Sequence, residues 1–155
     1  MKKIIAILFT AFLLTMCGTS KSAKADSKPQ VQYVDNFKPA SDKEKTAFLK
    51  KLNATEANYS VLILTKNFKG EQITVTNGEK VVYKEYPISN VKTRLAGELR
   101  IDNSLDTKVY DALTKKEATI PSKQAKNYKY VYLMKKPGAD NPFLITYSNT
   151  LRPME

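Results

Sequence analysis

The sequence lacks histidine and tryptophan altogether, and Cys17 is its only cysteine. Histidine is the commonest general base and the commonest metal ligand, so its absence excludes a Ser-His-Asp triad and removes the usual route to acid–base catalysis. The five glycines are scattered along the chain, so no glycine loop of the kind that cradles phosphate groups occurs. These absences disfavour an enzyme.

Residues 26–155 contain no cysteine, so this part of the chain forms no disulfide and offers no thiol as nucleophile or ligand. Asp102, Asp106 and Asp111 lie close in sequence, but their spacing does not match a calcium-binding EF-hand loop. We therefore expect no metal, no cofactor and no catalytic residue. A small hydrolase that uses carboxylates or a bound metal remains an alternative.

The N-terminus has the pattern of an export signal. Two lysines follow Met1, and residues 4–16 then form an uncharged apolar run. A membrane-spanning helix needs about 20 apolar residues, so this run is short for a span and typical of a secretory signal peptide.

Two processing sites follow the apolar run. Residues 14–17, Leu-Thr-Met-Cys, resemble the lipobox of bacterial lipoproteins, with Met16 in place of the usual small residue. Ala23-Lys24-Ala25 matches an ordinary signal-peptidase site. The signal peptide is therefore predicted to span residues 1–25, with cleavage after Ala25, or residues 1–16, with lipidation of Cys17. This leader resembles those of exported proteins from Gram-positive bacteria, which implies secretion or a lipid anchor on the outer face of the cell membrane.

The chain is basic, with 26 basic and 15 acidic residues. Without residues 1–25 the counts are 22 and 15, a net charge of +7. Such a charge attracts anionic surfaces, although the lysines are spread and the value is ordinary for a soluble domain. We expect the partner to be a protein or an anionic envelope polymer, with membrane contact only through a lipid on Cys17 and no specific nucleic acid.

Composition divides the rest of the chain into a linker and one domain. Residues 26–40 are polar, contain Pro29 and Pro39, and are predicted to form a flexible linker. Residues 41–155 form the predicted globular domain. It begins with a helix over 41–53, because Ser41 and Glu44 match a capping box ahead of an amphipathic run.

Strand patterns dominate after residue 58. The Asn77-Gly78 pair lies between two strand-like runs and predicts a hairpin with a type I′ turn. Further strands are expected at 59–65, 97–103, 127–136 and 142–148, whereas 107–113 fits a strand or a short helix. The pattern predicts a mainly β fold, an immunoglobulin-like antiparallel β-sandwich with one N-terminal helix. The alternative is an α+β fold with the helix on a single antiparallel sheet.

One strand carries the candidate binding residues. Tyr128, Tyr130 and Tyr132 alternate along it, with Lys129 and Lys135 beside them, and the interleaved Val131 and Leu133 suit a core face. Half-exposed rings between cations stack on sugar rings or bases, although cross-strand packing explains the same pattern.

We therefore predict a non-catalytic exported binding module at the cell envelope or outside the cell. The alternative from a different class is a secreted effector or inhibitor of a host or competitor protein.

Overall fold

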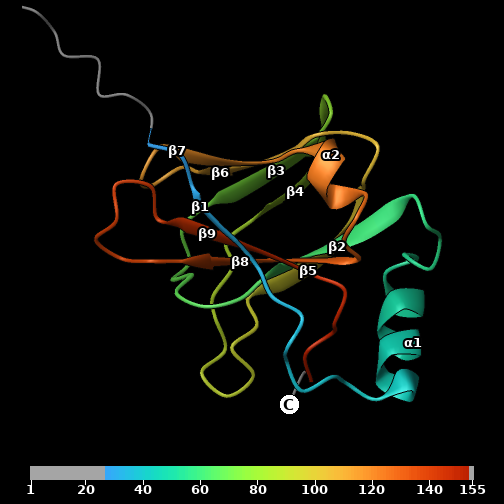
Figure 1. Ribbon diagram of the computed structural model, residues 1–155. Coiled ribbons are helices and arrows are strands. Elements are labelled where there is room, and N and C mark those ends of the chain that lie inside the picture. Colours follow the sequence, from blue (N-terminus) through green and yellow to red (C-terminus); the bar gives the residue numbers. More distant parts are fainter. Residues whose placement is uncertain (1–26, 154–155) are drawn as a thin grey trace, which may run out of the picture.

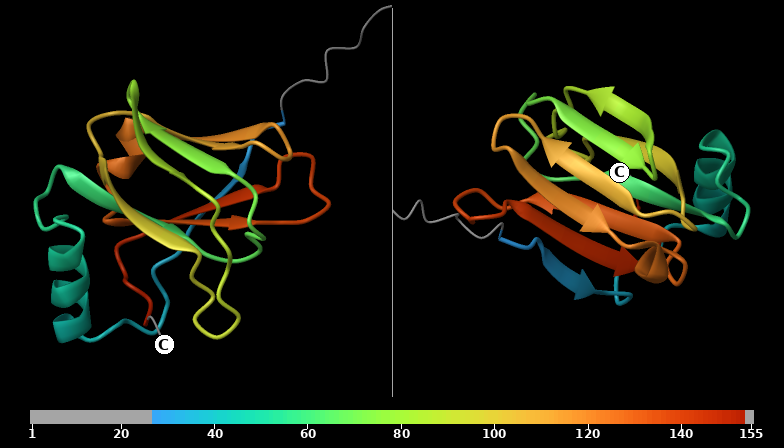
Figure 2. Two further views of the ribbon diagram at one scale, coloured as in Figure 1. Left: turned by 180° about the vertical axis from the view of Figure 1, so that it is seen from behind. Right: turned by 90° about the horizontal axis from the view of Figure 1, so that it is seen from above.

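The computed structural model describes residues 27–153 and is mainly β, with 40% strand and 11% helix. Its strands form two sheets that pack face to face (Figures 1 and 2). The elements are β1 (Gln30–Tyr33), α1 (Asp42–Lys51), β2 (Tyr59–Leu64), β3 (Ile73–Asn77), β4 (Lys80–Glu85), β5 (Gly97–Asp102), β6 (Thr107–Asp111), β7 (Lys116–Ile120), α2 (Ser122–Ala125), β8 (Tyr130–Lys135) and β9 (Phe143–Ser148).

The two sheets differ in strand direction. The larger sheet has five strands in the order β1-β9-β8-β2-β5, and its β1–β9 and β2–β8 pairs are parallel. The smaller sheet, β4-β3-β6-β7, is antiparallel throughout. The predicted two-sheet sandwich is thus confirmed in outline over the described residues, and the single-sheet alternative is wrong. The prediction of fully antiparallel sheets is wrong for the larger one.

The N-terminal helix follows the local sequence signals. Ser41 caps α1 by accepting a hydrogen bond from the Glu44 backbone, and the Glu44 carboxylate accepts one from the Ser41 backbone. The predicted capping box is therefore confirmed. The helix buries Phe48 against the outer face of the larger sheet.

The hairpin is present, but its turn lies one residue later than predicted. Gly78 and Glu79 connect β3 to β4, and of these two only Gly78 has a positive φ, +60°. This pattern fits a type II′ turn rather than type I′. Asn77 ends β3 instead, because its buried amide donates to the Asp102 carbonyl at 3.0 Å and the Thr107 hydroxyl at 2.9 Å.

Both faces of the larger sheet are covered. Leu62 and Leu133 face the smaller sheet and join the main core, whereas Val61 and Ile63 point to the opposite face. A second cluster on that outer face includes Phe48 of α1 and Leu151 near the C-terminus. The continuous apolar run of β2 follows from this double burial.

The segment predicted to be a linker belongs to the domain. β1 pairs in parallel with β9, and the Asn141 side chain donates to the Ser27 carbonyl at 2.8 Å. The predicted boundary at residue 41 is therefore too late. The side chains of β1 are exposed, so backbone hydrogen bonds to β9 hold this strand in place. It therefore lacks the apolar pattern by which a buried strand is predicted.

A buried ion cluster joins the two sheets at one end. Lys135 of β8 pairs with Asp111 of β6, at 2.7 Å, and with Glu71, which precedes β3. Burial is the largest single influence on both carboxyls and would raise their pKa. The hydrogen bond and charge of Lys135, together with neighbouring hydrogen bonds, outweigh burial and hold both pKa values below their usual range. Burial would lower the pKa of Lys135, but the hydrogen bonds and negative charges of Asp111 and Glu71 together raise it.

Candidate functional site

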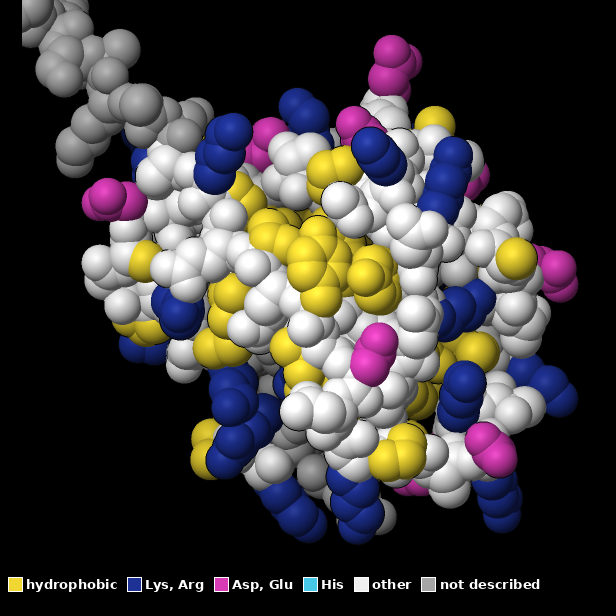
Figure 3. All heavy atoms as spheres, in the orientation of Figure 1, with side chains coloured by type: hydrophobic (Ala, Val, Ile, Leu, Met, Phe, Trp, Pro, Cys, Tyr) yellow, Lys and Arg dark blue, Asp and Glu magenta, His cyan; other side chains and the backbone are white. Residues whose placement is uncertain are grey.

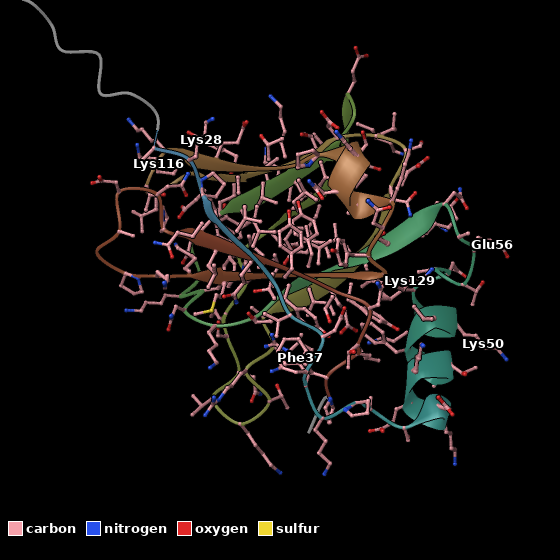
Figure 4. All side chains as sticks on the ribbon, in the orientation of Figure 1. Lys28, Phe37, Lys50, Glu56, Lys116 and Lys129 are labelled. Carbon is pink, nitrogen blue, oxygen red and sulfur yellow. The ribbon has the colours of Figure 1, made fainter. Side chains whose placement is uncertain are left out.

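The predicted tyrosine stripe is mostly core. Tyr130 and Tyr132 are 0% and 4% exposed, because α1, the segment around Phe37 and the C-terminal segment cover the outer face of β8 (Figure 4). The prediction that these rings are half exposed is therefore wrong for both. Burial raises the pKa of Tyr130 to about 12.

The other three predicted residues lie in different places. Tyr128 is half-buried and packs against Tyr33 and Tyr147. Lys129 donates from Nζ to the carbonyls of Glu56 and Tyr59, at 2.8 and 2.9 Å (Figure 4).

Lys135 lies on the inner face of β8, in the ion cluster, and is 7% exposed. The structure therefore does not bring the five predicted residues together on one surface. Val131 and Leu133 do form core, as predicted.

The hydroxyls of the two buried tyrosines differ in their partners. The Tyr132 hydroxyl donates to the Thr150 carbonyl and accepts from the Arg152 backbone, both at 3.0 Å. The Tyr130 hydroxyl is buried with no hydrogen-bond partner among the described residues. An unsatisfied buried hydroxyl lowers stability.

We expect the matched variants Tyr130→Phe and Tyr132→Phe to change stability in opposite directions. The first removes an unpaired group and should raise the free energy of unfolding by about 1 kcal/mol, whereas the second breaks two bonds and should lower it by about 1–2 kcal/mol. Urea denaturation of both variants beside the wild type checks this. A loss of stability in both would contradict the assignment of the unpaired hydroxyl.

A groove lies between the two sheets, where edge strands β1 and β7 face each other. Its volume is about 520 Å³, and we call it the β1–β7 groove. Figure 3 shows apolar side chains gathered at the centre of this face of the molecule. The lining comprises Ser27, Lys28, Pro29, Val31, Tyr33, Glu117, Thr119, Pro121, Gln124 and Tyr147.

An aromatic cluster forms the floor of the β1–β7 groove. The Tyr33 ring stacks on Tyr147 with centroids 5.4 Å apart and planes 18° apart, and it lies 5.5 Å from Tyr128. Tyr147 is 1% exposed, whereas Tyr33 is 53% exposed. Burial raises the pKa of the Tyr147 phenol. Tyr147 and Tyr128 thus support the Tyr33 ring, which remains open to a ligand.

Polar side chains line the opposite wall. Thr119 of β7 and Gln124 of α2 make no side-chain hydrogen bond within residues 27–153. Glu117 is exposed, and its carboxylate Oε1 lies 3.5 Å from the Lys108 Nζ. The Ser27 hydroxyl is buried without a partner in the same described range. The groove thus combines an open aromatic ring with uncommitted hydrogen-bonding groups, which is typical of ligand sites.

Sequence reasoning missed this groove. Tyr33 falls in the segment predicted to be a linker, and the sequence pattern predicts no element for residues 116–120. The available signal was the alternation in β7, where Ala118 and Ile120 are buried between more exposed residues.

The predicted cleavage site at Ala25 and the lipidation site at Cys17 lie outside the described residues. Within residues 27–153, no helix is both long and apolar enough to cross a membrane. The same residues include no group of three or more Cys, Asp or Glu side chains placed to hold a metal ion.

Taken together, the described residues define a two-sheet β domain with an aromatic groove between two edge strands. No protein-family model matches the chain, and no curated protein shows significant sequence similarity to it.

Proposed function

We propose that the protein is an exported, non-catalytic binding domain that holds the sugar rings of an envelope polymer in the β1–β7 groove. The observation that carries the proposal is the exposed ring of Tyr33, which is fixed by stacking on buried Tyr147. A pyranose ring presents an apolar C–H face that suits such a ring. Its hydroxyls suit the free side chains of Thr119 and Gln124.

The chemistry of the groove supports binding rather than hydrolysis. Glu117 is the one carboxylate among the described residues of its lining, whereas most glycosidases place two carboxylates across the scissile bond. Export is inferred from the leader sequence, which allows both a lipid-anchored and a freely secreted form.

An immunoglobulin-like relationship of the sandwich is a hypothesis, although the two parallel strand pairs weigh against it.

A second candidate is an effector or inhibitor that binds a partner protein. It is favoured by the position of β1 and β7 at the edges of their sheets, because an edge strand pairs readily with an extended peptide. In this case backbone pairing would give the affinity, and Tyr33 would contribute less than it does to sugar binding.

Tyr33→Ala tests the proposal. We expect the wild type to bind chitohexaose in calorimetry and purified peptidoglycan in co-sedimentation. The variant should bind at least about tenfold more weakly, because it loses the ring on which the sugar stacks. Tyr110→Ala is the matched control, since Tyr110 is 39% exposed on the other sheet and should leave binding unchanged. Equal binding by the wild type and Tyr33→Ala would contradict the proposal. A wild type that binds neither chitohexaose nor peptidoglycan would contradict it as well.

A further inference from the structure

A second pair of hollows lies away from the β1–β7 groove, around the loop that joins β4 to β5. Their volumes are about 490 and 450 Å³, and Lys66 and Arg94 line both. Figure 3 shows Lys and Arg side chains along the lower edge of the molecule, where Figure 1 places this loop. We call this region the basic end; its cations are Lys66, Lys69, Lys92, Arg94 and Arg152.

No carboxylate among the described residues neutralises the positive charge of the basic end. No Asp or Glu belongs to the described lining of either hollow. None of the five cations forms an ion pair with another residue in the range 27–153. Glu71 does accept a hydrogen bond from the Lys69 backbone, but its carboxylate is already paired with Lys135.

Arg152 is held in a fixed orientation at the wall of one hollow. Its guanidinium carbon lies 3.6 Å from the centre of the Phe37 ring and 4.4 Å from that of Tyr132. Its backbone N–H donates to the Tyr132 hydroxyl, and its Nε is buried without a hydrogen-bond partner among the described residues. A stacked guanidinium without a carboxylate partner is suited to bidentate recognition of an oxyanion.

The loop that carries Lys92 and Arg94 is shaped by its own hydrogen bonds. The Asn90 side chain accepts from the backbones of Lys92 and Thr93, at 2.8 and 3.0 Å. The Arg94 backbone donates to the Asn90 carbonyl at 2.8 Å. These bonds fix the loop backbone, so little backbone conformational entropy is lost when a ligand binds its two cations.

We propose that the basic end binds a soluble ligand with two or more linked phosphate groups. One phosphate would lie against Arg152 and Arg94, and the next would lie in the neighbouring hollow with Lys66 and Lys69. Two adjacent hollows that share cations favour a chain of phosphates over a single one. This site is separate from the β1–β7 groove and does not depend on sugar binding there.

Calorimetry with sodium tripolyphosphate at about 0.15 M salt tests the proposal, because this salt screens charges more than about 8 Å apart. Lys66→Gln/Arg94→Gln should bind at least about tenfold more weakly than the wild type, because it loses two charge-assisted contacts. The control Lys123→Gln/Lys126→Gln removes the same charge from exposed positions at α2 and should change binding less than about twofold.

Arg152→Lys separates a fitted site from diffuse attraction. It keeps the charge but loses the planar donor pair, so binding should weaken about fivefold or more. Thermal melts of each variant establish that it is folded. Equal losses in the two double variants, or no binding of tripolyphosphate by the wild type, would overturn the proposal. Binding only to phosphatidylglycerol vesicles would overturn it as well, because it would indicate a membrane surface rather than a soluble ligand.

Discussion

Lys135→Met is expected to lower the free energy of unfolding by about 3–5 kcal/mol. The substitution leaves Asp111 and Glu71 as two uncompensated carboxylates in the buried cluster that joins the sheets. Urea denaturation at neutral pH measures the loss. Lys136→Met is the matched control. Its side chain is exposed and, within the part of the chain that the structure describes, bonds only Gln30, so we expect a change within about 0.5 kcal/mol.

The pH dependence of the same variant shows whether charge is the cause. In the wild type, the lowered pKa values of Asp111 and Glu71 contribute stability above about pH 4, which is lost as the pH falls through the folded-state values. Without Lys135, burial raises both values instead, and protonation then relieves the buried charge. The difference between Lys135→Met and the wild type should therefore shrink from pH 7 to about pH 4. A difference independent of pH would contradict this explanation.

Tyr132→Ala is expected to lower the free energy of unfolding by about 3–5 kcal/mol, because it empties a buried aromatic position between β8 and the segment that covers it. Tyr33→Ala should cost only about 1 kcal/mol, since the Tyr33 ring is half exposed and the variant loses only its contacts with Tyr147 and Tyr128. Denaturation of the two variants under one condition compares a core tyrosine with a groove tyrosine. Similar losses would contradict the distinction between the outer-face core and the open groove.

How far the sequence predicts this fold depends on whether the signal is local. The capping box of Ser41 and Glu44 and the face formed by Val131 and Leu133 follow from neighbouring residues, and both are present. The burial of Tyr130 could not be read from β8, because the covering elements lie far away in the chain.

The position of Lys135 could have been predicted more closely. It shares the two-residue period of Val131 and Leu133, so it belongs on the inner face of β8. The tyrosines beside Lys135 in the sequence obscure this, because its buried partners Asp111 and Glu71 come from distant segments. Tyr33 was missed because β1 is an edge strand held by backbone bonds in a polar, proline-containing segment.

The central claim, that the β1–β7 groove binds sugar rings, is tested most directly by a ¹H–¹⁵N NMR titration with chitohexaose. We predict saturable shifts concentrated at the amides of Tyr33, Thr119 and Gln124, and their loss in Tyr33→Ala. Saturable shifts confined to residues outside the groove, or no shifts at all, would contradict the claim.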